Sequence, residues 1–276
     1  MSDLSPPQNM MVSVVVPVYC GADYLAALVA ALDDLRREWQ AQGAPFTLAE
    51  AIFVEDAAID DSGARIDQLA REHSWIVPLH LARNFGQHPA TIVGILHSSG
   101  DWVVTMDEDL QHRPEVIATL LRKAVTEHAD IVYANPVSTV HDAAIRDWTS
   151  RSFKRMMQWL TDNPNLSSFN SFRLIRGPVA RAAASVCSHD TYLDITLGWF
   201  TQSIRAIRIE MKDERYIKTK RSGYSLKSLL SHGWRMIFSS QIKLLRIGSV
   251  LGLAAMVLSV LAAIYFLMVK IFSPAD

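Results

Sequence analysis

Three consecutive acidic residues, Asp107, Glu108 and Asp109, directly follow an apolar run in this 276-residue chain. Like charges in contact repel one another and lose hydration near a core, so a positive group is expected beside them. If the run continues as a strand, alternation places Asp107 and Asp109 on one side and Glu108 on the other. Two such carboxylates can hold Mg²⁺ or Mn²⁺ together with substrate phosphates. The triplet is therefore a candidate metal and diphosphate site, and the alternative is a solvated acidic loop.

Polar residues also follow other apolar runs of the chain. Asp56, beside Glu55, can accept hydrogen bonds from a nucleobase or ribose, or can form an Asx-type turn. Arg83 and Asn84 precede a predicted helix that starts at Gly86, and the free N–H groups of a helix start favour anions. The alternative is that Gly86 only eases the turn.

Strands and helices alternate over the first 135 residues, with strands predicted at 12–19, 50–57, 76–82, 100–107 and 130–135 and helices between them. This alternation is typical of a doubly wound, mostly parallel α/β sheet. Ligands of such sheets bind beyond the carboxyl ends of the strands, which is where these polar residues lie. Further on, strands are predicted at 168–176 and 204–211, with a helix at 177–186 between them.

The composition excludes some functions and the C-terminus indicates a membrane. Net charge is −1, which does not point to nucleic acid. Two distant cysteines, Cys20 and Cys187, lack metal-ligand spacing and suit a reducing compartment. Residues 247–269 carry no charge and as a helix span roughly 35 Å, enough to cross a hydrocarbon core of about 30 Å. Lys243 and Arg246 precede the span and only Lys270 follows it, so the large domain is expected in the cytoplasm.

Four segments occur in a fixed order, and together they form a specific pattern. They are VSVVVPVY (12–19), FVEDAAIDDS (53–62), LARNFGQHPATIVGI (81–95) and GDWVVTMDEDLQHRPE (100–115). This pattern resembles glycosyltransferase family 2, the inverting nucleotide-sugar enzymes with a GT-A fold. It is most similar to the membrane-attached branch of polyprenyl- and dolichyl-phosphate sugar synthases, over nearly the whole chain.

The resemblance implies a division of the chain and roles for particular residues. Residues 1–11 are expected as a disordered tail, 12–224 as a cytoplasmic GT-A domain, 225–246 as amphipathic interfacial helices and 247–271 as a single C-terminal transmembrane helix. For residues 225–246, helices packed on the domain are the alternative.

Pro17 and Tyr19 would line the nucleotide pocket, and Asp56 would meet a base that is uracil or guanine. Asp107 and Asp109 would hold the metal and diphosphate beside Gln111. Arg215, Arg221 and Ser222 would clamp phosphate.

The chain departs from the family pattern at two places. Ala57 and Ala58 stand where the family usually has a Gly-Ser pair, so the backbone contacts of that turn are expected to differ. The arginine-containing segment is also about two residues longer than the common pattern, and it lacks the usual glycine before Arg221.

The resemblance implies an inverting transfer from a UDP- or GDP-linked sugar to a membrane polyprenyl phosphate, by one in-line displacement. An anionic acceptor needs positioning rather than a strong base. If the acceptor is instead a glycan or lipid hydroxyl, a base is required. Asp190 and Asp194 lie near the expected acceptor side. Asp194 is the candidate, with a helix cap or salt bridge as its structural alternative. A membrane-anchored scaffold with a decayed transferase site is the non-enzyme alternative. Trp199 and Phe200 are expected in the core, and a homo-oligomer is left open.

Overall fold

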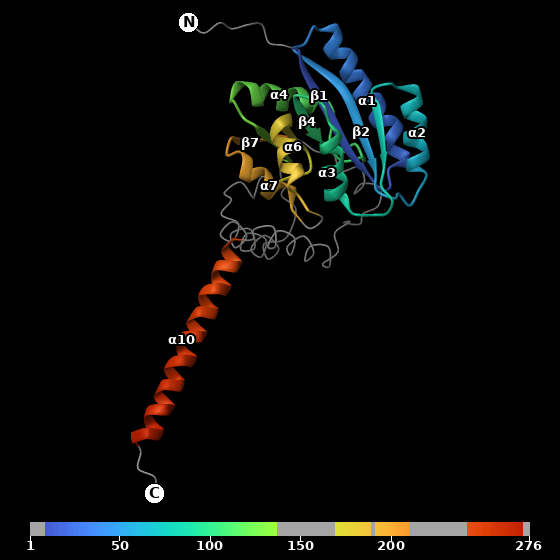
Figure 1. Cartoon of the computed structure of the whole chain (residues 1–276). Coiled ribbons are helices and arrows are strands. Elements are labelled where there is room, and N and C mark those ends of the chain that lie inside the picture. Colours follow the sequence, from blue (N-terminus) through green and yellow to red (C-terminus); the bar gives the residue numbers. More distant parts are fainter. Residues whose placement is uncertain (1–8, 137–168, 189–190, 210–241, 273–276) are drawn as a thin grey trace, which may run out of the picture.

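The computed structural model describes residues 9–136, 169–188, 191–209 and 242–272 (Figure 1). In these ranges the strands are β1 Met10–Val18, β2 Phe46–Glu55, β3 Ile76–His80, β4 Trp102–Thr105, β5 Ile131–Pro136, β6 Arg173–Arg176 and β7 Ile204–Ile209. The helices are α1 Ala22–Ala41, α2 Ser62–Glu72, α3 Gln87–His97, α4 Val116–Thr126, α6 Gly177–Ser185, α7 Leu193–Phe200 and α10 Ile242–Phe272.

These strands form one mixed sheet in the order β3-β2-β1-β4-β6-β5-β7. Strand β1 pairs in parallel with β2 and β4, and β2 pairs in parallel with β3. Strand β6 lies antiparallel between β4 and β5, and β7 runs parallel to β5. The expected doubly wound α/β sheet is confirmed. The chain passes from β1 outward to β3 and then crosses to β4 on the other side of β1, so a topological switch point lies between β1 and β4.

Strand β1 is buried on both faces of the sheet, as its run of β-branched residues predicts. Val12, Val14 and Val16 point into the core cluster that includes residues of α1, α2 and α4. Val15 points into the opposite cluster, which includes residues of α3, α6 and α7. Helix α3 approaches the sheet so closely at Gly94 that a Cβ atom there would lie only 2.3 Å from Cγ1 of Val15. Helices therefore cover both faces (Figure 1).

The strand boundaries differ from those expected by a few residues, and two of these differences matter for the tail and for the site. Strand β1 begins at Met10, inside the tail expected over 1–11, because the Met10 N–H donates to the Pro45 carbonyl at 2.9 Å and the Met11 N–H donates to Asp101 at 2.8 Å. Strand β4 ends at Thr105. The acidic triplet therefore lies in the turn after β4, where strand alternation no longer decides the direction of its side chains.

Helix α10 contains the candidate membrane span Gly248–Phe272, and none of its most apolar window is buried. The helix begins at Ile242 rather than at 247, so it takes in the end of the segment expected to be interfacial. Residues 225–241 lie outside the described residues. Figure 1 shows α10 running away from the sheet.

Candidate active site

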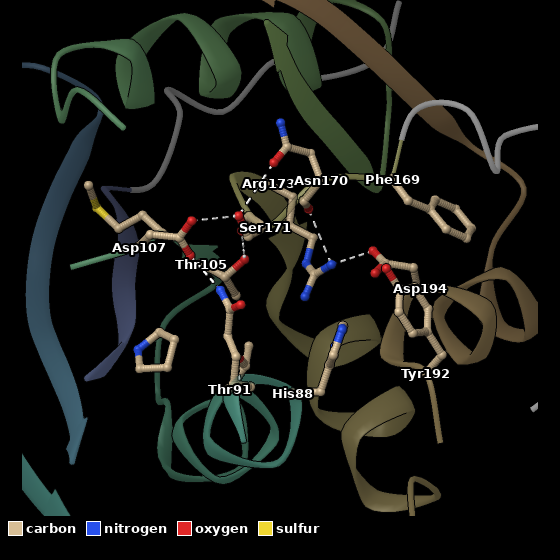
Figure 2. Close-up of a pocket in the computed structure, with 13 residues that line it drawn as sticks. His88, Thr91, Thr105, Asp107, Phe169, Asn170, Ser171, Arg173, Tyr192 and Asp194 are labelled. Carbon is tan, nitrogen blue, oxygen red and sulfur yellow. Dashed lines mark hydrogen bonds and ion pairs between the residues drawn. The ribbon is translucent and has the colours of Figure 1, made fainter. Parts of the chain in front are cut away.

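A pocket of about 320 Å³ lies at the carboxyl ends of β1 and β4, at the switch point of the sheet (Figure 2). Its walls come from the end of β1, the start of α3, the end of β4, the residues before and in β6, and the start of α7. The lining residues are Pro17, Gln87, His88, Thr91, Thr105, Met106, Asp107, Phe169, Asn170, Ser171, Arg173, Tyr192 and Asp194.

Asp107 faces this pocket and is held there by three separate segments. Its Oδ1 accepts a hydrogen bond from Gln87 Nε2 at 2.6 Å, and its Oδ2 accepts one from Ser171 Oγ at 2.9 Å (Figure 2). Its backbone N–H donates to Nδ1 of His112 at 2.9 Å. Each carboxylate oxygen has a further lone pair, so the oriented group can still bind a cation.

His112 is a positioning residue for Asp107 that the sequence reasoning missed. Its ring is buried and stacks on Phe172, with ring centroids 4.8 Å apart. Burial lowers the pKa of His112, and the nearby carboxylates of Asp107 and Asp109 oppose this effect without reversing it. The lowered pKa favours the neutral ring, whose Nδ1 is needed as the acceptor. The only sequence signal was a polar residue directly after the acidic turn.

The other two acids of the triplet point to different partners. Glu108 accepts hydrogen bonds from the backbone N–H groups of Tyr19 at 2.8 Å and Cys20 at 3.2 Å, so it ties the turn to the end of β1. Asp109 is 7% exposed and accepts a hydrogen bond from the Gln111 N–H at 3.2 Å. For Asp107 and Glu108 the expected positive partner is thus replaced, in these contacts, by neutral N–H and O–H donors.

Asp56 organises the loop before α3. It is 2% exposed, and its two oxygens accept hydrogen bonds from the backbone N–H groups of Phe85 and Gly86, both at 2.7 Å. Gly86 has a φ of 94°, a left-handed conformation that favours glycine. The Arg83 guanidinium lies 4.6 Å from the centroid of the Phe85 ring. The role of Asp56 toward a base stays a prediction.

The backbone at Ala57 shows why the family pattern usually has glycine at this position. Ala57 has a φ of 47°, in the left-handed region, although it has a Cβ atom. The next residue, Ala58, donates its N–H to Oε1 of Glu55. The turn therefore forms without glycine, at the cost of backbone strain.

Asp194 is held in a buried ion pair rather than presented as an unpaired carboxylate. It is 1% exposed, its Oδ1 pairs with Nη1 of Arg173, and it accepts a hydrogen bond from the Tyr133 hydroxyl at 2.7 Å. Burial, and then the charge of Asp194, raise the pKa of Tyr133 well above its usual value, which keeps this hydroxyl protonated as a donor. The salt-bridge alternative for Asp194 is the one observed.

Aromatic rings form the wall beside this ion pair. The ring centroids of His88 and Tyr192 are 4.4 Å apart, and those of Phe169 and Tyr192 are 6.2 Å apart. Trp199 and Phe200, at the end of α7, are 57% and 43% exposed. The expectation that these two residues belong to the core was wrong, because α7 ends there and no described element covers them.

The structure gathers only some of the predicted site residues around the pocket. Pro17, Asp107 and Asp194 line it. Other predicted residues lie outside its lining, namely Tyr19, Asp56, Arg83, Asn84, Asp109 and Gln111. Arg215, Arg221 and Ser222 lie outside the described residues. Sequence reasoning missed Gln87, Ser171 and Arg173, which carry no distinguishing spacing in the chain.

The fold and the strand-end pocket define a GT-A-like class of α/β protein. Residues 13–180 match the family model described as "Glycosyl transferase family 2", and the chain belongs to this family and is a glycosyltransferase. It is 29% identical, over 91% of its own length and 75% of the relative's, to an "Undecaprenyl-phosphate 4-deoxy-4-formamido-L-arabinose transferase" of Klebsiella pneumoniae. An equally named protein of Pseudomonas fluorescens is 28% identical over 96% of this chain and 75% of the relative.

Solved structures share the fold at low sequence identity. A mannosyl-3-phosphoglycerate synthase from Rubrobacter xylanophilus superposes with a TM-score of 0.59 at 14% identity, covering 87% of this chain and 75% of that one. A glucosyl-3-phosphoglycerate synthase from Mycobacterium tuberculosis, in complex with Mn²⁺ and UDP-glucose, has a TM-score of 0.56 at 13% identity and covers 83% and 77%.

Proposed function

We propose that this glycosyltransferase moves one sugar from a UDP- or GDP-linked donor to a membrane polyprenyl phosphate, with inversion at the anomeric carbon. The names of the relatives in Klebsiella pneumoniae and Pseudomonas fluorescens support this acceptor class. The structural observation that carries the proposal is the ion pair of Asp194 with Arg173. A hydroxyl acceptor requires a base, and the carboxylate expected for that role is buried and paired; a phosphate acceptor is already anionic.

The two carboxylates of Asp107 and Asp109 suit a divalent cation that is also bound by the substrate. Among the described residues no group of three or more His, Cys, Asp or Glu side chains is arranged to hold a metal. Mg²⁺ commonly takes one or two carboxylates and completes its shell with phosphates and water. Asp107, oriented into the pocket, and Asp109 in the same turn would therefore hold Mg²⁺ or Mn²⁺ together with the donor diphosphate. When bound, such an ion neutralises the charge that develops on the leaving nucleoside diphosphate.

The remaining roles are assigned to the chain's own residues. Pro17 and Tyr19 would border the nucleotide, with Asp56 shaping the loop of Arg83 and Asn84 next to it, and Gln111 would lie beside the diphosphate. The arginines at 215 and 221, with Ser222, would position the acceptor phosphate, because guanidinium groups bind phosphate with two parallel hydrogen bonds.

The candidate membrane span would bring this site to its lipid. Helix α10 would anchor residues 12–224 to the cytoplasmic face of the membrane. A polyprenyl phosphate head group lies at that surface, so anchoring raises its effective concentration at the pocket.

The test uses membranes that contain the full chain, Mn²⁺, undecaprenyl phosphate and a panel of UDP- and GDP-linked sugars. Mass spectrometry of the extracted lipid is expected to show the mass of one added sugar, and NMR an inverted anomeric configuration. Asp107→Asn should reduce the product by at least about 100-fold, the loss expected for a group that stabilises developing charge. Sugar transfer to a glycan or lipid hydroxyl, with none to undecaprenyl phosphate, would instead support the hydroxyl-acceptor alternative. No metal-dependent binding of UDP or GDP, together with no transfer, would support the scaffold.

A further inference from the structure

The wall of the pocket opposite Asp107 combines a buried ion pair with aromatic rings. Arg173 and Asp194 are 2% and 1% exposed, and both line the pocket (Figure 2). Their ion pair is supported by Tyr133, whose hydroxyl donates to Asp194, and by the Asn170 carbonyl, which accepts from Nη1 of Arg173 at 3.3 Å.

The hydrogen-bonding capacity of Arg173 is only partly used. Its Nη1 serves Asp194 and the Asn170 carbonyl, whereas its buried Nε has no hydrogen-bond partner in the part of the chain that the structure describes. A buried donor without a partner is costly, and most such groups in proteins are satisfied by protein, water or ligand. Because Arg173 also lines the pocket, its guanidinium group is placed to donate to a ligand that carries several hydroxyl groups.

The charges of the lining favour a neutral ligand over a phosphate at this wall. The described lining carries two carboxylates, Asp107 and Asp194, and one guanidinium, Arg173, whose charge is already balanced by Asp194. A phosphate placed here would meet no net positive charge from these groups. Sugar hydroxyls both donate and accept, so they suit a fixed Arg–Asp pair, and the rings of Tyr192 and Phe169 offer apolar faces to the carbon side of a sugar.

The size of the pocket points to one sugar ring. Its volume of about 320 Å³ lies at the low end of the roughly 300–1,000 Å³ typical of ligand pockets, so the pocket suits the sugar part of a nucleotide-sugar. Asp107, the proposed diphosphate side, borders the same pocket. A sugar attached to a diphosphate at Asp107 would therefore extend toward Arg173 and Asp194.

We infer that the Arg173–Asp194 pair forms hydrogen bonds with the hydroxyl groups of the donor sugar and thereby sets the sugar specificity of the enzyme. This inference rests on the proposed nucleotide-sugar donor but not on the identity of the acceptor. Arg173 contacts the sugar directly, whereas Tyr133 acts through Asp194 as a positioning residue.

The test compares donor binding with nucleotide binding, which needs no acceptor. The double variant Arg173→Gln/Asp194→Asn replaces both charged groups with neutral amides and leaves no lone buried charge. Affinities for UDP, UDP-glucose, UDP-N-acetylglucosamine, GDP and GDP-mannose are measured by calorimetry on the full chain in detergent with Mn²⁺. Arg176→Gln, on the exposed end of β6, is the matched control.

The double variant should weaken binding of the preferred nucleotide-sugar roughly 10- to 100-fold, the effect of losing a charge-assisted hydrogen bond, and leave the nucleoside diphosphate affinity within about twofold. Its discrimination between sugars should fall by a similar factor. An equal loss of affinity for the nucleotide-sugar and for the nucleoside diphosphate would overturn the inference. So would unchanged affinity for both ligands combined with slower transfer to the lipid. Either result would leave the proposed function standing. No binding of any nucleotide or nucleotide-sugar by the wild-type protein would overturn the donor assignment and the inference together.

Discussion

Ser171 donates a hydrogen bond from its Oγ to Oδ2 of Asp107 at 2.9 Å, although the two residues are 64 positions apart in the chain. The contact exists because β6 inserts antiparallel beside β4, which brings the residues before β6 to the end of β4. Together with Gln87 from α3, Ser171 fixes the direction of the carboxylate that we assign to the metal.

Removing these two donors should weaken metal binding without removing the proposed ligand. Ser171→Ala and Gln87→Ala are each expected to lower Mn²⁺ affinity, in the presence of UDP or GDP, by about 10- to 100-fold, as is typical when the hydrogen-bond partners of a metal ligand are lost. Manganese electron paramagnetic resonance measures the free ion in such a titration. Ser185→Ala, on the exposed end of α6, is the control and should change nothing. Unchanged affinity in both site variants would argue that Asp107 does not bind the metal.

Breaking the buried ion pair on one side should destabilise the domain strongly. Arg173→Gln leaves Asp194 as an unpaired buried charge, and the free energy of unfolding should fall by about 3–5 kcal/mol. The double variant Arg173→Gln/Asp194→Asn should recover most of this loss. The side chains of Arg176 and Asp130 are 61% and 23% exposed, so Arg176→Gln should cost less than about 1 kcal/mol. Urea unfolding of the full chain in detergent provides the comparison, and a double variant as unstable as the single one would contradict this account.

The strain at Ala57 should be relieved by glycine. Ala57 is left-handed with a φ of 47°, and relief of about 1–2 kcal/mol is opposed by the greater freedom of glycine in the unfolded chain. Ala57→Gly should therefore raise the free energy of unfolding by up to about 1 kcal/mol. Ala30→Gly, at an exposed position within α1, should lower it by about 1 kcal/mol. Thermal unfolding measures both variants, and equal destabilisation by the two would show that Ala57 is not strained.

The cluster around His80 should make stability depend on pH. Burial lowers the pKa of His80, but hydrogen bonds with Glu55 at 3.2 Å and Asp67 at 3.0 Å outweigh it and raise the pKa above its usual 6.5. A raised pKa means that the folded state holds the proton more tightly. The stabilisation is therefore complete below about pH 6.5 and is lost as pH rises through the folded-state pKa.

Nuclear magnetic resonance titration of the imidazole checks this expectation directly. The His80 pKa should lie above 6.5 in the wild-type protein and should fall in Asp67→Asn. The stability advantage of the wild-type protein over His80→Gln should shrink as pH rises from 6 to 8. A His80 pKa below 6.5, or an advantage that grows with pH, would refute the assignment.

Strand-end residues could be predicted from the chain because their position depends on local pattern. Runs such as that of β1 identify buried strands, and parallel strands bring their carboxyl ends to one edge. Asp56 and Asp107 were placed at that edge in this way. The same reasoning missed that β4 ends at Thr105, because the end of a strand depends on which neighbour it pairs with.

The sequence by itself determined the fold class, the family and the edge of the sheet where the site lies, since these follow from periodicity and from motifs within short segments. Only the tertiary structure decided which side chains meet there. The antiparallel β6 carries Ser171 to Asp107, and it places Arg173 beside Asp194 of α7. Contacts of this kind depend on strand order and side-chain packing between segments far apart in the chain, so no spacing along the sequence encodes them.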